Sequence, residues 1–123
     1  MEKAKIKSFT DLVAWQKAHA LALSVYKITR DFPSNEQFGL TSQIRRAAVS
    51  AVPNIAEGFG RGSYVDKNRF YQMSRGSLTE LQSQLLIARD IDYLEQGEFG
   101  RIAEETVVTM KLINGLIKSS KDR

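Results

Sequence analysis

Few residues in this chain have the type and spacing that catalysis needs. There is one histidine, His19, and there is no cysteine. A di-iron helical bundle needs two Glu-x-x-His pairs, which one histidine cannot supply. The absence of cysteine excludes thiol catalysis and cysteine-ligated metal sites. Two acidic pairs, Glu104-Glu105 and Asp90-x-Asp92, lack partners at metal-ligand spacing. We therefore predict no catalytic residue, no metal site and no cofactor.

Two weaker catalytic patterns are present. Gly58-x-Gly60-x-Gly62 could bind phosphate through backbone amides, but no strand precedes it and the Lys-Ser/Thr of a P-loop is missing. We interpret it as a turn that ends a helix. An enzyme that places Glu57 or Glu80 in a deep pocket remains an alternative.

Basic residues suggest an anionic partner. The net charge is +4, and the balance is +4 over residues 1–30, +2 over 31–75 and −2 over 76–123. Between Arg61 and Arg75 the bases are interleaved with Tyr64, Phe70 and Tyr71, so phosphate contacts and base stacking are both conceivable there. The alternative is that Phe70 lies in the core, Tyr71 packs at an edge and the bases are solvated. The residues predicted to contact phosphates are Arg45, Lys67, Arg69 and Arg75.

A polar stripe recurs at helical spacing in the middle of the chain. Its short amides, hydroxyls and arginines suit a hydrogen-bonded, partly buried seam better than a solvated face, which would be rich in Lys and Glu. Glu57 and Arg61 are spaced for an ion pair. We predict that the stripe belongs to an oligomer interface or polar seam, and a solvated face is the alternative. Its residues are Gln43, Arg46, Ser50, Asn54, Glu57 and Arg61, with Ser77, Glu80 and Gln84 as counterparts.

Four helices must position these residues. Apolar periodicity predicts helices over about 10–31, 35–59, 63–93 and 96–118. Ser8 or Thr10 can cap the first helix, and Ser63 with Asp66 can cap the third. Pro53 is expected to kink the second helix without breaking it. Helices of similar length with short connections predict an all-α, antiparallel up-down four-helix bundle.

The same periodicity predicts which side chains face the core. On the first helix Trp15, Ala22 and Tyr26 widen the buried stripe. The residues expected to be buried are Ala14, Ala18, Leu21, Val25, Ile28 and Phe32 on the first helix, Phe38, Leu40, Ile44, Ala48, Ala51, Val52, Ile55 and Phe59 on the second, Phe70, Met73, Ser77, Leu81, Leu85 and Ala88 on the third, and Phe99, Ile102, Thr106, Met110, Ile113 and Ile117 on the fourth.

The whole chain is expected to form one domain. We predict a bundle over residues 1–123, with a basic tail over 1–8 and a C-terminal tail over 119–123. No apolar stretch reaches the length of a membrane span and no secretory signal is seen at the start. Together with the absence of cysteine, this predicts a cytoplasmic protein without membrane contact.

Four ordered blocks resemble one known family. They are Phe9-Thr-Asp-Leu-Val-Ala-Trp15-Gln-Lys-Ala18 with Phe32-Pro33-Ser-Asn-Glu36, Leu40-Thr-Ser-Gln-Ile-Arg-Arg46-Ala-Ala-Val-Ser50, Asn54-Ile-Ala-Glu57-Gly58 with Gly60-Arg61, and Gly76-Ser77-Leu-Thr-Glu80-Leu81. Together they are similar to the 23S ribosomal RNA intervening sequence proteins over about residues 8–94. The resemblance implies an antiparallel four-helix bundle that assembles as a ring-like homopentamer and has no established catalytic activity.

A related branch of that family serves reverse transcriptases as an accessory protein, so the resemblance also implies a reverse transcriptase as a possible partner. Two functions follow. The first is a non-enzymatic, oligomeric bundle that binds nucleic acid, RNA or DNA, through phosphate contacts by a basic surface. The alternative is a homo-oligomeric adaptor that binds another protein and does not itself touch nucleic acid. A salt-dependent affinity for naked RNA separates them.

Overall fold

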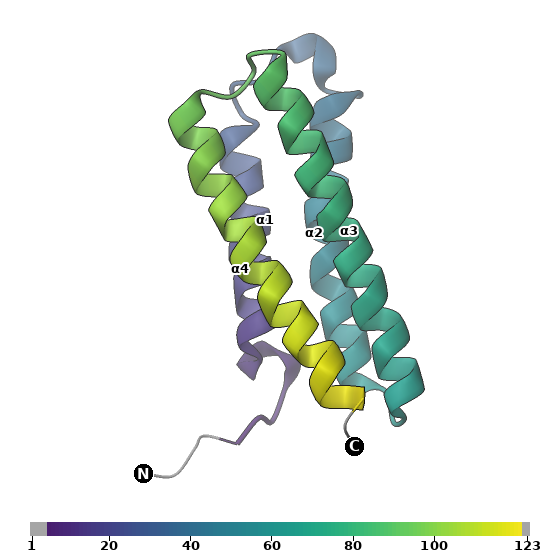
Figure 1. The fold of residues 1–123 in the computed structure, drawn as a ribbon. Coiled ribbons are helices and arrows are strands. Elements are labelled where there is room, and N and C mark those ends of the chain that lie inside the picture. The colour runs from purple at the N-terminus through teal and green to yellow at the C-terminus, as the bar shows by residue number, and fades with distance from the viewer. Residues whose placement is uncertain (1–4, 122–123) are drawn as a thin grey trace.

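A computed structural model describes residues 5–121 and contains four long helices (Figure 1). They are α1 (Val13–Ile28), α2 (Leu40–Gly60), α3 (Tyr64–Asp90) and α4 (Gln96–Lys121), with the 3-10 helices η1 (Phe9–Asp11) and η2 (Ser34–Glu36) before α1 and α2. Successive helices run in opposite directions, and each packs against two neighbours in the cyclic order α1, α2, α3, α4 (Figure 1). The predicted all-α four-helix bundle is confirmed.

The helix ends differ from the predicted bounds by a few residues, for local reasons. Ser8 forms a capping box with Asp11, but the box starts η1, and α1 begins only at Val13. Residues 34–36 form a separate 3-10 turn, so α2 begins at Leu40. The hydroxyl of Ser63 accepts a hydrogen bond from the Asp66 amide and caps α3 as predicted. At the other end α4 continues to Lys121, into the predicted tail, while residues 1–4 and 122–123 of both predicted tails lie outside the described part.

The hydrophobic core runs along the axis of the bundle and has mostly the predicted composition. Every helix contributes residues with almost no exposed surface, which include Leu21, Val25, Ile44, Ile55, Leu81, Leu85, Ile102 and Ile113. Besides Met73 on α3, two expected core residues lie outside it. Phe38 is 90% exposed because it precedes α2 in the turn after η2, and Tyr26 is 43% exposed at the edge of α1.

The first half of α3 is rotated by about one residue relative to the prediction. Tyr71, Ser74 and Leu78 are buried there, whereas Phe70 and Ser77 are half-buried and Met73 is exposed. A hydrogen bond explains the rotation. The hydroxyl of Ser74 donates to the main-chain carbonyl of Ala51 at 2.6 Å, which turns this polar residue toward α2. The predicted inward positions of the second half, Leu81, Leu85 and Ala88, are correct.

Small residues let α2 and α3 approach closely. Buried Ala47, Ala48 and Ala51 line α2, and Gly58 lies directly under the ring of Tyr71. A Cβ atom on Gly58 would be 2.5 Å from the Tyr71 Cε1 atom, which is closer than packed atoms approach. Gly58 and Gly60 are helical, and no described glycine has a positive φ. The predicted three-glycine turn is therefore wrong for Gly58, which serves packing.

The end of the bundle that holds the α1–α2 and α3–α4 connections is closed by Tyr93. Its hydroxyl donates to Glu36 Oε2 at 2.8 Å, and its ring packs on Phe32 with 5.4 Å between centroids. The other carboxylate oxygen of Glu36 accepts from the Leu40 amide at the start of α2. The hydrogen bond to Glu36, with desolvation, raises the pKa of Tyr93 above its usual value, because the donor must stay protonated. One carboxylate thus ties the two connections together.

The packing of Gly58 predicts opposite outcomes for two glycine-to-alanine changes. Gly58→Ala should lower the free energy of unfolding by about 1–3 kcal/mol, because the new methyl group overlaps the Tyr71 ring. Gly76→Ala should raise it by about 0.5–1 kcal/mol, since a Cβ there meets no atom within 4 Å and alanine favours the helix. Urea denaturation of both variants measures this. Equal effects of the two changes would contradict the packing role of Gly58.

Candidate nucleic-acid and protein interfaces

Arg45, the first predicted phosphate contact, is partly engaged within the bundle. Its Nε donates to the Thr29 hydroxyl at 2.9 Å, and its guanidinium group lies 4.7 Å from the centroid of the Tyr26 ring. Both partners belong to α1 or its end, so Arg45 ties α2 to α1. The side chain is half-buried.

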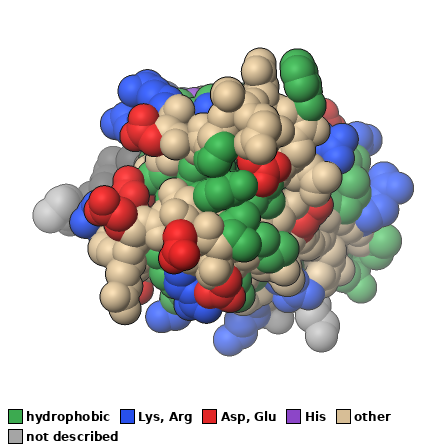
Figure 2. Space-filling view, turned by 90° about the horizontal axis from the view of Figure 1, so that it is seen from above, with side chains coloured by type: hydrophobic (Ala, Val, Ile, Leu, Met, Phe, Trp, Pro, Cys, Tyr) green, Lys and Arg blue, Asp and Glu red, His purple; other side chains and the backbone are tan. Residues whose placement is uncertain are grey.

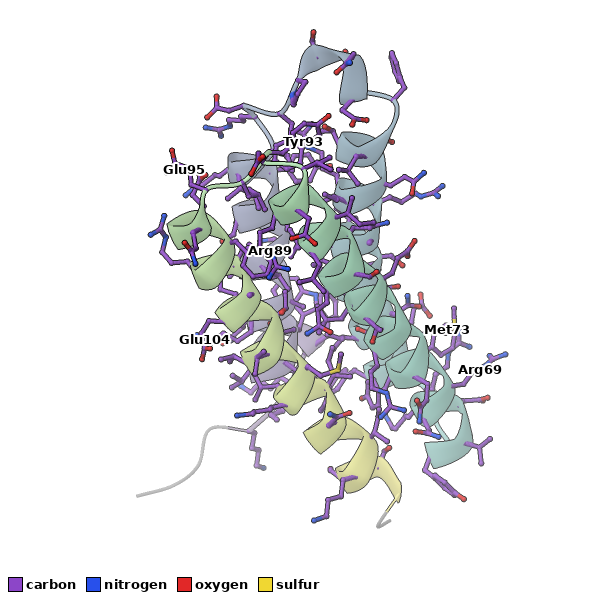
Figure 3. The ribbon with its side chains drawn as sticks, turned by 45° about the horizontal axis from the view of Figure 1, so that its top comes forward. Arg69, Met73, Arg89, Tyr93, Glu95 and Glu104 are labelled. Atoms are coloured by element: carbon purple, nitrogen blue, oxygen red, sulfur yellow. The ribbon has the colours of Figure 1, made fainter. Side chains whose placement is uncertain are left out.

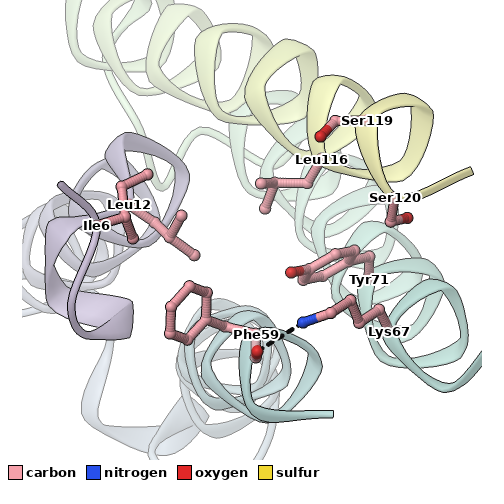
Figure 4. A pocket seen from close by; sticks show the side chains of 8 residues that line it. All are labelled: Ile6, Leu12, Phe59, Lys67, Tyr71, Leu116, Ser119 and Ser120. Atoms are coloured by element: carbon pink, nitrogen blue, oxygen red, sulfur yellow. Dashed lines mark hydrogen bonds between the residues drawn. The ribbon is translucent and has the colours of Figure 1, made fainter. Parts of the chain in front are cut away.

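Lys67 is turned toward the chain rather than outward (Figure 4). Its Nζ donates to the carbonyl oxygens of Phe59 at 2.6 Å and Gly58 at 3.3 Å. These carbonyls belong to the last turn of α2, where a cation is favoured because the helix carbonyls there lack helical partners. Lys67 thereby caps α2 at the mouth of a cavity of about 330 Å³ at the end of the bundle, lined by Ile6, Leu12, Phe59, Tyr71, Leu116, Ser119 and Ser120 (Figure 4).

Arg69 and Arg75 have different surroundings. Arg69 is exposed and points away from the bundle beside Met73 (Figure 3). Its guanidinium lies 5.0 Å from the Phe70 ring, which Arg61 also covers at 4.5 Å. Arg75 instead bridges α3 and α4, since its Nη1 donates to Asn114 Oδ1 at 3.0 Å and its Nη2 donates to Gln72 Oε1.

The four predicted phosphate contacts therefore do not form one patch. Arg45 faces α1, Arg75 faces α4, and Lys67 and Arg69 lie near the start of α3. The aromatic residues nearby offer little free ring surface. Tyr71 is buried rather than packed at an edge, and Phe70 is half-buried beneath two arginines. Basic and aromatic residues that are close in sequence between Arg61 and Arg75 therefore lie on different sides of α3.

The predicted polar stripe does follow the seam between α2 and α3. The hydroxyls of Ser50 and Ser77 are hydrogen-bonded at 3.0 Å across the two helices, and the Asn54 amide donates to the Ser50 carbonyl at 2.9 Å. Arg61 pairs with Glu57 at 3.0 Å on the surface of α2. The centre of the stripe is half-buried, while its outer members Gln43, Arg46, Glu57, Arg61 and Glu80 are exposed.

One acceptor in this seam is buried without a donor. Gln84 is 7% exposed, and its Nε2 donates weakly to Glu80 Oε1 at 3.4 Å, but its Oε1 has no hydrogen-bond partner among the described residues. Leaving a buried polar atom unpaired costs about 1–3 kcal/mol. The second such atom is Thr41 Oγ1, near the start of α2.

An apolar groove between α1 and α2 was not foreseen from the sequence. It has a volume of about 510 Å³ and is lined by Phe9, Trp15, His19, Ala22, Leu23, Tyr26, Val49, Val52, Pro53 and Ala56. Leu23 is 55% exposed and Val49 is 43% exposed, so the surface is open to a ligand. The seven- and four-residue spacing of Trp15, Ala22 and Tyr26 is the available signal, and by itself it predicts only a widened core face.

The closed end of the bundle is acidic. Seen from above, acidic side chains surround a small hydrophobic area (Figure 2). A depression at this end is lined by residues of the α3–α4 connection and its surroundings, among them Asp31, Asp92, Glu95 and Glu98. A polyanion would be repelled here, so the flanks of the bundle are the more favourable surfaces for phosphate contacts.

The residues considered for catalysis are dispersed. His19 is exposed and its ring stacks on Trp15, with 4.8 Å between centroids. Glu57 and Glu80 are both exposed, so neither lies at the base of a deep pocket. Within residues 5–121, no group of three or more His, Asp or Glu is arranged to hold a metal ion.

The family model described as 23S rRNA-intervening sequence protein matches residues 10–115. The chain belongs to this family. Its bundle resembles the crystal structure of a protein of unknown function from the S23 ribosomal protein family of Bacteroides thetaiotaomicron, with a TM-score of 0.79. That match covers 86% of this chain and 96% of the Bacteroides chain at 20% identity, and it supports the fold alone. No curated protein matches the chain.

Neither the family description nor the name of the Bacteroides protein specifies a reaction. Within residues 5–121 none of the helices of this family member combines the length and the hydrophobicity that crossing a bilayer requires. The family membership therefore supports the fold, and the family's description contains a link to 23S rRNA.

The different surroundings of Lys67 and Arg69 predict different effects of the same change. Lys67→Met should lower the free energy of unfolding by about 1–2 kcal/mol, because the last carbonyls of α2 lose their cationic donor. Arg69→Met removes an equal charge from an exposed position and should stay within about 0.5 kcal/mol of the parent protein. Thermal and urea unfolding measure both. A larger loss for Arg69→Met would show that capping is not the role of Lys67.

Proposed function

We propose that this chain is a non-enzymatic protein that assembles with its own copies and binds nucleic acid, RNA in the first place, through contacts to phosphates. The distribution of charge carries the proposal. Residues 5–61, which form α1, α2 and the segments joined to them, contain eight Lys and Arg against four Asp and Glu. Residues 62–121, which form α3 and α4, contain eight of each. The whole excess of positive charge therefore lies on the α1–α2 half.

Exposed cations on this half are suited to phosphate contacts. Lys17, Lys27, Arg30 and Arg46 are exposed, and Arg45 and Arg61 hold their guanidinium groups at aromatic rings near the surface. Such contacts release counterions from the nucleic acid and give an attraction that does not depend on sequence. Assembly would multiply the effect, since five copies, the number the family resemblance implies, carry a net charge of +20.

Salt dependence tests direct binding. We expect a labelled structured RNA to bind in a fluorescence anisotropy titration, with an affinity that falls steeply as salt is raised. A duplex DNA of similar length is titrated in parallel, and equal affinity would indicate backbone recognition, whereas preference for RNA would indicate recognition of shape or unpaired bases. Absence of binding to RNA and DNA at low salt would overturn the proposal.

A pair of double variants tests which half of the bundle binds. Lys17→Gln with Arg46→Gln removes two exposed charges from the α1–α2 half, and Arg101→Gln with Lys111→Gln removes two from exposed positions of α4. The first pair should lower the salt slope by about 0.7–0.9 for each phosphate that the protein no longer neutralises, and the second should leave it nearly unchanged. Equal reductions would mean that only the net charge matters.

Self-assembly is proposed to use the seam between α2 and α3. The exposed polar residues Gln43, Arg46 and Glu80 beside the half-buried Ser50 and Ser77 support an interface there, because short polar groups on a surface can hydrogen-bond to a second copy.

Glu80→Lys should reduce the assembly, as measured by analytical ultracentrifugation, since it reverses a charge in this seam. Glu104→Lys makes the same change at an exposed position of α4 and serves as the control. Unchanged mass for Glu80→Lys, or equal loss for both variants, would exclude the seam as the interface.

A protein adaptor is the second candidate function, and the outer face of α3 favours it. Val65 and Met73 near its start, Ile87 near its end and Ile91 just after it are between 45% and 62% exposed, and exposed apolar side chains that lie near one another are typical of protein contacts. A reverse transcriptase is one partner that the family resemblance suggests. Salt-dependent binding of naked RNA would count against an adaptor that reaches nucleic acid only through its partner.

A further inference from the structure

The wall of the groove formed by η1 and α1 consists largely of aromatic rings. Phe9, Trp15, His19 and Tyr26 all line it. Trp15 and His19 are nearly parallel, with 17° between their planes, and Phe9 meets Trp15 edge-on at 5.3 Å. Tyr26 is 43% exposed and Phe9 is 37% exposed, so ring surface is available to a ligand. Exposed rings are the surfaces on which unpaired bases stack.

The opposite wall is aliphatic. Val49, Val52, Pro53 and Ala56 of α2 form it, and none of these side chains carries a hydrogen-bonding group. Base edges would find no side-chain donors or acceptors on this wall, so binding against it would depend on stacking and burial and would tolerate many sequences. The volume of about 510 Å³ lies within the range of roughly 300–1,000 Å³ that is usual for small-ligand sites.

Arginines lie at both ends of the groove. Arg45 covers the Tyr26 ring at one end. At the other end an adjoining depression is lined by Phe9, Ala56 and Arg61 together with Glu57 and Gly60. Glu57, the acidic residue of this lining, is already paired with Arg61 at 3.0 Å. The groove thus lies on the half of the molecule that holds the net positive charge, which complements a phosphate backbone.

We propose that this groove binds a short stretch of unpaired nucleotides, with bases against the aromatic wall and phosphates near Arg45 and Arg46. The inference rests on the proposed nucleic-acid function and adds its binding site and ligand class. The rise from Trp15 to Tyr26 is about 16 Å, from 1.5 Å per helical residue. A stacked single strand at about 3.4 Å per nucleotide would place four or five nucleotides along it.

Charge and ring placement favour nucleotides over a second helix in the groove. The aromatic wall faces the short aliphatic side chains of α2. The guanidinium of Arg45 already lies over the Tyr26 ring, and an unpaired base stacks on an aromatic ring in the same way.

Trp15 is the only tryptophan of the chain, so its emission reports on the groove directly. We expect an oligouridine of about twelve nucleotides, within the usual site sizes, to quench Trp15 fluorescence saturably. A duplex RNA of the same length serves as the control and should bind in anisotropy without comparable quenching, because its bases are already stacked and paired.

A matched pair of variants locates the site. Val49→Glu places a carboxylate in the groove at a position that is 43% exposed, and Val107→Glu makes the same change on α4 at a position that is 40% exposed. The first should weaken oligouridine binding about tenfold or more, and the second should leave it within about twofold. Circular dichroism confirms that both variants are folded.

The outcomes separate this inference from the proposed function. If neither RNA binds, both are overturned. If oligouridine binds in anisotropy without quenching Trp15, or if the two variants weaken it equally, only the groove site is overturned. If Val49→Glu lowers the mass of the assembly and leaves RNA affinity unchanged, the groove holds another copy of the chain, and the nucleotide site is likewise overturned.

Discussion

The close approach of α2 and α3 is the constraint on which the other arrangements depend. It requires a glycine under Tyr71, a hydroxyl of Ser74 on the Ala51 carbonyl and paired serines at positions 50 and 77. These contacts set the rotation of α3 about its axis. The same rotation sends Met73 and Ile87 to the surface and leaves the Gln84 carbonyl oxygen in the seam. Features proposed for assembly therefore follow from packing that serves the protomer itself.

The molecule divides its surface by chemistry. The α1–α2 half combines net positive charge with an aromatic groove. The outer face of α3 carries both apolar and polar side chains, and the end of the bundle that holds the α1–α2 and α3–α4 connections is acidic. A nucleic acid on the first surface and a protein on the second would not compete for the same residues. Nucleic-acid binding and protein contacts are thus compatible in one bundle.

Periodicity was sufficient for the number, order and approximate limits of the helices, because apolar spacing and caps such as Ser63 are local. Periodicity predicted the wrong rotation for the first half of α3, since Phe70 and Tyr71 are both suited to a core position. Ser74 is turned inward by its hydrogen bond to the Ala51 carbonyl, which is distant in sequence. The candidate sites depended more on distant contacts. Lys67 and Arg75 are adjacent to basic neighbours in sequence, yet one caps α2 and the other reaches α4. The groove between α1 and α2 could not be predicted, because the spacing of apolar residues indicates which side of a helix they face. It does not indicate whether other side chains fill the space between two helices.

The order of the helices has a consequence for how the chain folds. α2 and α3 are joined by residues 61–63 alone and meet along their whole length, so their contacts are local and their closure costs little entropy. The contact between α1 and α4 instead joins distant parts of the chain, as in the hydrogen bond from Ser24 to Glu105, 81 positions apart. We expect the α2–α3 hairpin to form early and α1 to dock on α4 late. The walls of the groove belong to α1 and α2, which are connected by residues 29–39, so these walls can come together before α1 docks on α4.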